Sequence, residues 1–261
     1  MFIKVISIIS SLTLLSRVLG YLRDLLIAKV IGAGLISDCF FIAFKLPNLF
    51  RRLFAEGSMN SAFIPVVSGV REKVGKIEAD QFFSKIFSML IIFLFFFVIL
   101  LEIFTPLVIS LIAPGFSEDT LKKELTVDFA RLTFPFLLFI CATSLIGAYL
   151  NTLGKFASMA LTPVILNLTI ITCLVIFFKN TDQIFITYYL SLSISIAGII
   201  QLVWMLYNLK RNKVCLSVFG LNKNKFRKPT NKFFKLLVPA ILGNGVYQLN
   251  LLIDMILAST L

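Results

Sequence analysis

The sequence predicts an all-α protein that crosses a membrane several times. Its 261 residues are 59% hydrophobic, include 28 phenylalanines and have a mean hydropathy of +0.97. A soluble domain of this size could not bury so much apolar surface. Uncharged blocks of helix-spanning length recur at residues 132–154, 156–178 and 183–209. A transmembrane β-barrel would instead alternate polar and apolar positions over short strands. We therefore expect an all-α polytopic membrane protein.

Seven spans are expected, and a glycine turn separates the first two. The first span covers residues 5–31, and Gly32-Ala33-Gly34 ends it. The second covers residues 35–70, which is too long for one straight crossing. It also contains Pro47, Gly57 and Pro65. Because proline and glycine weaken a helix locally, we expect this span to be bent or broken.

Five further spans are expected at residues 82–113, 126–150, 157–178, 184–209 and 233–261. Pro114-Gly115 ends the third span, whereas Pro135 lies inside the fourth and Pro163 lies near the start of the fifth. Pro239 interrupts the seventh. Neighbouring helices can satisfy the backbone groups that such prolines leave free. Interrupted helices beside a cavity are common in transporters.

The distribution of charge predicts the orientation and the organisation of the chain. Residues 210–232 hold eight lysines and arginines and no acid, which is most of the net charge of +12. The positive-inside rule accounts for this charge, because it places the segment and the N-terminus in the cytoplasm. Nucleic acid is therefore not an expected partner. The predicted organisation is an N-terminal lobe of six spans (1–209), a basic cytoplasmic loop (210–232) and a seventh span that begins a second lobe (233–261).

The first two spans carry an excess of positive charge. Residues 16–56 contain six cations and three acids, which are Arg17, Arg23, Lys29, Lys45, Arg51 and Arg52 against Asp24, Asp38 and Glu56. An ionised side chain at the centre of a membrane helix costs about 2.5–3.5 kcal/mol. The excess predicts a polar cavity that binds an anionic ligand. Charges that snorkel or pair between helices are the alternative, which we favour for Lys29, Arg51 and Glu56.

The spacing of these charges places several of them on facing stripes. Asp38, Lys45 and Arg52 are seven residues apart and share one helix face. On the antiparallel first helix, Arg23 would lie level with Asp38 and Arg17 level with Lys45, so that Asp38 neutralises an outer cation. Arginine suits a diphosphate because its planar fork binds two oxygens at once. We predict that Arg17, Arg23, Asp38, Lys45 and Arg52 bind the ligand.

The run from Ser16 to Val66, SRVLGYLRDLLIAKVIGAGLISDCFFIAFKLPNLFRRLFAEGSMNSAFIPV, resembles the signature of the MurJ (MviN) family of lipid II flippases. The later segments APGF (113–116), TFPF (133–136), GAYLNTLGKF (147–156) and PAILG (239–243) follow in the family's order. This family lies within the multidrug, oligosaccharidyl-lipid and polysaccharide exporter superfamily. The resemblance implies a transporter rather than an enzyme, in the bacterial cytoplasmic (inner) membrane. It also implies fourteen spans in two lobes around a cationic cavity.

The resemblance also implies roles for individual residues. Arg17, Arg23 and Arg52 match the family's cavity arginines, and Asp38 matches its nearby carboxylate. Asp254 is similar in position to an aspartate with which some members bind sodium, so a sodium ion is an implied ligand. The implied partners are membrane lipids and lipid II, a disaccharide peptide linked to undecaprenyl diphosphate.

The family has about twice this many residues, so the resemblance covers its N-terminal half. We expect the chain to be a truncated form of such a flippase. A second lobe, or a second copy of this chain, is expected to be required for function.

Two other functions are open on the residues alone. One is export of another lipid-linked oligosaccharide or of a drug, although the arginine excess argues against cationic drugs. The other is an intramembrane enzyme acting on polyprenyl phosphates, which would use a carboxylate cluster with metal or a histidine. The chain has no histidine. We therefore expect no catalytic residue and no metal site, and transport by alternating access.

Overall fold

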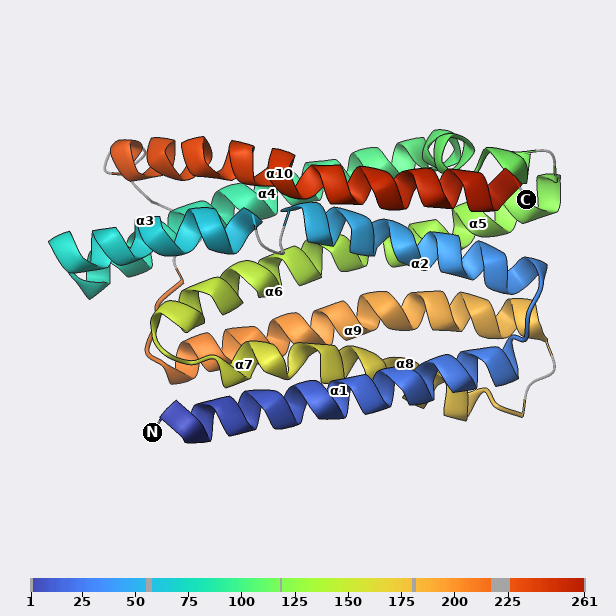
Figure 1. The fold of residues 1–261 in the computed structure, drawn as a ribbon, viewed down its shortest axis with the longest axis horizontal. Helices are drawn as coiled ribbons and strands as arrows, with labels where there is room; N and C mark the ends of the chain where they lie inside the picture. The colour runs from blue at the N-terminus through green and yellow to red at the C-terminus, as the bar shows by residue number, and fades with distance from the viewer. Residues whose placement is uncertain (1, 55–57, 118, 180–181, 217–225, 261) are drawn as a thin grey trace.

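The computed structural model describes residues 2–54, 58–117, 119–179, 182–216 and 226–260, and these residues form helices without any strand. Figure 1 shows the long helices lying along one axis, with the two termini at opposite ends of the bundle. The elements are α1 (Phe2–Val30), α2 (Leu35–Phe54), α3 (Ser58–Val74), α4 (Lys76–Ile112), the 3-10 turn η1 (Pro114–Ser117), α5 (Thr120–Thr133), α6 (Pro135–Thr152), α7 (Ala157–Ala160), α8 (Thr162–Ile176), α9 (Gln183–Arg211) and α10 (Arg227–Thr260).

Helices suited to a membrane make up most of the described chain. Among the described residues, six helical stretches are long and apolar enough to cross it: Ile6–Val30, Lys76–Ile112, Thr120–Thr152, Ala157–Ile176, Gln183–Arg211 and Arg227–Leu257. The chain is therefore a multi-pass membrane protein, as predicted. The charged pair α2 and α3 is not among the six, and it runs along the same bundle (Figure 1). The predicted total of seven crossings stays a prediction.

Two described helices cover most of the second predicted span. Helix α2 ends at Phe54 and α3 begins at Ser58, and α3 continues toward the end of the bundle to which α2 points (Figure 1). Residues 55–57, which include Gly57 and Glu56, lie outside the described residues. Pro47 and Pro65 lie inside α2 and α3.

Two further prolines begin helices. Pro135 starts α6 directly after Phe134, and Pro163 lies in the first turn of α8. Proline fits there because the first amides of a helix have no partner within that helix. The fourth and fifth predicted spans are thus each divided into two helices.

The predicted basic loop extends too far toward the C-terminus. Helix α10 begins at Arg227, so residues 227–232 are helical rather than loop. Pro229 is tolerated in this first turn, and two aromatic contacts fix the start of the helix. The rings of Phe226 and Phe82 lie 5.9 Å apart, and those of Phe233 and Phe63 lie 6.2 Å apart. The start of α10 therefore packs against α3 and α4.

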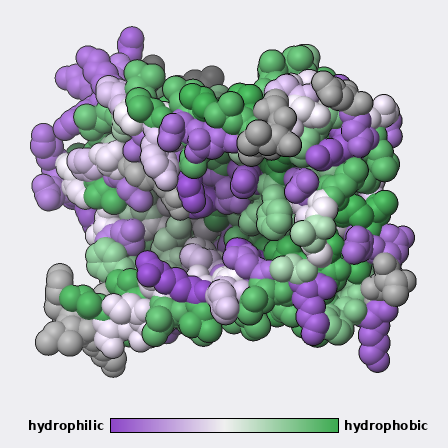
Figure 2. Space-filling model, turned by 45° about the vertical axis from the view of Figure 1, so that its right-hand side comes forward, coloured by the Kyte–Doolittle hydropathy of each residue, from purple (hydrophilic) through white to green (hydrophobic). Residues whose placement is uncertain are grey.

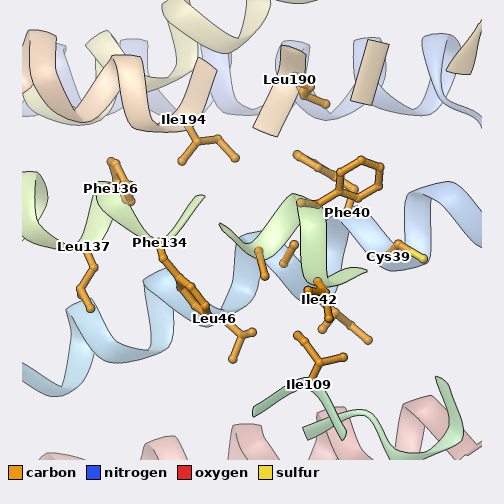
Figure 3. Close-up of a cluster of buried hydrophobic side chains, with 14 of the residues drawn as sticks. Cys39, Phe40, Ile42, Leu46, Ile109, Phe134, Phe136, Leu137, Leu190 and Ile194 are labelled. Atoms are coloured by element: carbon orange, nitrogen blue, oxygen red, sulfur yellow. The ribbon is translucent and has the colours of Figure 1, made fainter. Parts of the chain in front are cut away.

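The apolar face of α2 is buried in the main core. Phe40, Ala43 and Leu46 have no exposed surface. Figure 3 shows Phe40, Ile42 and Leu46 in one cluster with side chains of α4, α6 and α9. The Thr133 hydroxyl also donates a hydrogen bond of 2.9 Å to the carbonyl oxygen of Ala43. Burial of this face leaves the opposite, charged face of α2 open.

Gly198 allows α9 to approach α6 closely. A β-carbon at this position would lie 2.9 Å from Cδ2 of Phe136 and 3.0 Å from Cβ of Phe139. We predict that Gly198→Ala lowers the free energy of unfolding by about 1–3 kcal/mol, because the helices must move apart. Thermal unfolding in detergent measures this change.

Gly69→Ala on α3 is the matched control. Nothing lies within 4 Å of an added β-carbon there, and alanine is preferred to glycine in a helix by roughly 0.5–1 kcal/mol. We expect this variant to be as stable as the original or more so. An equal loss of stability in both variants would contradict the packing argument.

Candidate functional site

Helix α2 presents basic side chains on the face opposite the core. Lys45 and Arg52 are exposed, whereas Leu46 and Leu49 between them are buried. The seven-residue spacing keeps the two cations in line along the helix. The sequence pattern of α2 is therefore realised as a buried apolar face and an open cationic face.

The open face of α2 borders a hollow that also involves α1, α8 and α10. Its volume is about 670 Å³, and its charged lining residues are Arg23, Lys45, Arg51, Arg52 and Asp254. We term it the cationic hollow. The other lining residues are Phe44, Asn48, Leu49, Pro163, Leu166, Asn167, Gln248, Leu251 and Met255. Figure 2 shows a recess with hydrophilic side chains around it between apolar surfaces.

The charges of the hollow favour an anion. Its lining contains four basic side chains but one acidic side chain. Like charges repel more strongly near low-dielectric protein and lipid than they do in water. A polyanion with several oxygens relieves this repulsion and gives the guanidinium groups charge-assisted hydrogen bonds. A neutral or cationic ligand would leave the repulsion in place.

Arg23 of α1 is held by three different groups. Its Nε and Nη2 donate to one carboxylate oxygen of Asp24 at 2.9 and 2.7 Å. Its Nη1 donates to Oδ1 of Asn167 on α8 at 2.9 Å. The guanidinium carbon also lies 5.8 Å from the ring centre of Phe44 on α2. These contacts fix the position of the guanidinium at the wall of the hollow.

Asn167 is a site residue that the sequence reasoning missed. Besides accepting from Arg23, it donates from Nδ2 to the carbonyl oxygen of Ser16 at 2.9 Å. It therefore fastens α8 to α1 and orients Arg23 at the same time. The sequence does single it out, because Asn167 is the one carboxamide side chain in the uncharged block 156–178. Polar side chains inside membrane helices often join helices or mark a functional site.

The structure brings together some of the predicted ligand-binding residues but not all. Arg23, Lys45, Arg52 and Asp254 line the cationic hollow. Arg17 is exposed on α1 and is not among the lining residues. Asp38 also lies outside the lining, so the roles of Arg17 and Asp38 stay predictions.

The predicted pairing of Asp38 with Arg23 is wrong. The Asp38 carboxylate lies 3.8 Å from Nζ of Lys122, whereas Arg23 pairs with its neighbour Asp24. The reason is tertiary, because α5 packs along α2 and supplies Lys122 from its first turn.

The three charges for which we favoured a structural role have different outcomes. Nζ of Lys29 lies 5.1 Å from the ring centre of Phe178, a cation–π contact that fits a structural role. Arg51 instead lines the cationic hollow, and its Nε donates to Oδ1 of Asn48 at 3.3 Å. The hydrogen bond to Asn48 fits a structural role for Arg51, and the role of Arg51 stays a prediction. Glu56, and its pairing with Arg52, lie outside the described residues.

The residues around Asp254 fit a sodium ion poorly. Asp254 and the Gln248 amide supply oxygens to the lining, but four cations line the same hollow. Sodium prefers a site rich in oxygen ligands and poor in positive charge. Within the described residues, no group of three or more Cys, Asp or Glu residues is arranged to hold a metal ion. The carboxylate of Asp254 suits a counter-charge to the cations instead, and the sodium hypothesis stays a prediction.

Comparisons with known proteins converge on one family. The family described as "Lipid II flippase MurJ" matches residues 27–261. A "Probable lipid II flippase MurJ" of Rickettsia prowazekii is 38% identical over 97% of this chain and 48% of its own length. The protein of the same description from Rhizobium tropici is 36% identical over 95% of this chain and 46% of its own length.

A solved structure gives the same result for the fold. The structure titled "Lipid II flippase MurJ, inward closed conformation" superposes with a TM-score of 0.77 at 29% identity. It covers 97% of this chain and 50% of the solved chain. The chain thus spans about half the length of the relatives that it matches.

Proposed function

The chain belongs to the lipid II flippase MurJ family, and on that premise we propose that it forms the first lobe of a flippase for lipid II in the bacterial cytoplasmic membrane. The observation that carries this proposal is the cationic hollow. Three arginines and a lysine line it, inside a bundle of membrane-spanning helices. Lipid II carries a diphosphate between its headgroup and its lipid tail, which is the kind of anion that such a hollow binds.

The proposed mechanism gives each part of the hollow a task. Arg23 and Arg52 bind the diphosphate oxygens, and Lys45 adds a positive charge without a fixed fork. Asp24, Asn167 and Phe44 hold Arg23 so that its guanidinium need not be ordered when the lipid binds. The polyprenyl tail stays in the bilayer beside the open hollow. A second lobe then rocks against this one, and the hollow opens to the other side.

A binding measurement tests this function against the drug-exporter alternative. The purified 261-residue chain in lipid nanodiscs is titrated with undecaprenyl diphosphate, with undecaprenol and with a dicationic drug, and native mass spectrometry measures the bound fraction. We expect the diphosphate to bind at least 10-fold more tightly than the alcohol, because charge-assisted hydrogen bonds contribute about 1.5–3 kcal/mol each. Tighter binding of the drug would favour the alternative.

The proposed orientation places the N-terminus and Cys215 in the cytoplasm. Cys215 is exposed, and the other three cysteines are buried. With the buried cysteines replaced by alanine, we predict that an impermeant maleimide does not label Cys215 in intact cells. The reagent should label a cysteine introduced at the exposed Thr120, at the other end of the bundle (Figure 1). Labelling of Cys215 alone would reverse the orientation.

A further inference from the structure

A second hollow adjoins the cationic one. Its volume is about 490 Å³, and residues of α1, α2, α6, α7, α8 and α9 line it. We term it the inner hollow. The two hollows share four lining residues, which are Asn48, Arg51, Pro163 and Leu166. A ligand in the cationic hollow therefore has a neighbouring space into which it can extend past Arg51.

The inner hollow differs from the cationic one in its chemistry. Arg51 is the one charged residue in its lining, and it stands at the shared wall. The remaining polar lining residues are neutral: Thr13, Asn48, Ser144, Asn151, Thr162 and Gln201. Several apolar side chains, among them Phe136 and Met159, complete the wall. A lining of apolar side chains with a few polar groups, at this volume, is typical of small-molecule binding sites.

Gln201 carries the argument because it is buried and only half satisfied. The side chain is 1% exposed, and its Nε2 donates to the carbonyl oxygen of Thr162 at 2.7 Å. This bond fixes which end of the amide is the nitrogen. Its Oε1 is buried without a hydrogen-bond partner among the described residues. Oδ1 of Asn151, another lining residue, is likewise buried without a hydrogen-bond partner among the described residues.

The two unsatisfied atoms select one kind of ligand group. Both are carbonyl-type oxygens, which accept hydrogen bonds and cannot donate them. A buried acceptor without a donor destabilises the site that contains it. Hydroxyl and amide N–H groups are the matching donors, whereas an ionised phosphate or carboxylate offers these two oxygens no donor. The inner hollow therefore suits the neutral part of a lipid-linked headgroup better than its anionic part.

We propose that the inner hollow binds the hydroxyl- and amide-bearing part of the headgroup while the diphosphate lies in the cationic hollow, with Gln201 and Asn151 as the specificity-determining acceptors. This proposal rests on the proposed function and deepens it. The diphosphate then supplies affinity that any polyprenyl diphosphate shares. The inner hollow supplies the preference for a lipid that carries a sugar–peptide headgroup.

The test compares two lipids that differ only in the headgroup. Native mass spectrometry of the 261-residue chain in nanodiscs gives the dissociation constants for undecaprenyl diphosphate and for lipid II. We expect Gln201→Leu to weaken lipid II binding about 3- to 10-fold and to leave undecaprenyl diphosphate binding unchanged. Asn151→Leu should act in the same direction, which protects the test if one variant folds poorly. Arg52→Ala should weaken both lipids.

Asn208→Leu is the matched structural control on the same helix. Asn208 is also buried, but its Oδ1 accepts from Ser158 at 2.9 Å and its Nδ2 donates to the carbonyl oxygen of Trp204 at 2.8 Å. It does not line the inner hollow. We expect this variant to unfold at a lower temperature with the ratio of the two dissociation constants unchanged.

The remaining outcomes separate this inference from the function on which it rests. In one outcome, Arg52→Ala weakens the binding of both lipids while the Gln201 and Asn151 variants leave the ratio of the two dissociation constants unchanged. In that case the inner hollow holds water rather than the headgroup, and the inference is wrong. If the unsubstituted chain binds neither lipid, the proposed function fails and the inference fails with it.

Discussion

Arg23→Ala and Arg52→Ala are each expected to abolish the growth that a two-lobe version of this protein restores to cells depleted of their lipid II flippase. Arg52 lies on the open face of α2, and Arg23 is held at the wall by Asn167 and Asp24. Each substitution removes a guanidinium group that can bind two phosphate oxygens, which costs about 1.5–3 kcal/mol or roughly 10- to 150-fold in affinity. Growth at the restrictive condition, with membrane insertion checked by immunoblot, measures the effect.

Conservative variants separate charge from geometry. Arg23→Lys and Arg52→Lys keep the positive charge but lose the planar fork, so we expect them to restore growth incompletely. Lys29→Ala is the matched control, because Lys29 contacts the Phe178 ring and does not line the hollow. Normal growth with both arginine-to-alanine variants would show that the cationic hollow is not the transport site.

The 261 residues by themselves are expected to restore no growth. Lys45, Arg52 and Asp254 are exposed, and the hollow that α2 and α10 border is open. Alternating access requires a second body against which this wall can close. The lobe alone can therefore bind the lipid without carrying its headgroup across the membrane.

Supplying the other lobe should reverse this result. The chain is expressed alone, fused to the second lobe of a MurJ relative, or together with that lobe as a separate polypeptide. We expect growth in the second and third cases. Robust growth with the 261 residues alone would contradict the prediction and would point to two copies that form the cavity between them.

The sequence predicted the parts of the site that lie on one helix. The seven-residue spacing of Lys45 and Arg52 is local, so the helical period alone placed both cations on one face, and both line the hollow. Gly57 and its flanking prolines likewise predict an interruption of this span, and the helices α2 and α3 flank residues 55–57, which lie outside the described residues. These conclusions need no knowledge of how the helices pack.

The parts that depend on packing could not be predicted. Asp38 pairs with Lys122, which is distant in sequence and reaches it only because α5 lies along α2. Asn167 belongs to the wall because α8 packs on α1, yet its own segment is uncharged. Arg51 is the sequence neighbour of Arg52, yet it lines both hollows. That position follows from how seven helices pack around the two hollows.

The central claim is that the cationic hollow moves an anionic lipid headgroup across the membrane. Its most direct test is the amount of lipid II headgroup accessible at the outer face of flippase-depleted cells, measured with an impermeant headgroup-degrading toxin. Cells with the two-lobe protein should expose the headgroup, and cells with its Arg52→Ala variant at equal abundance should retain it inside. Equal exposure in both strains would contradict the account.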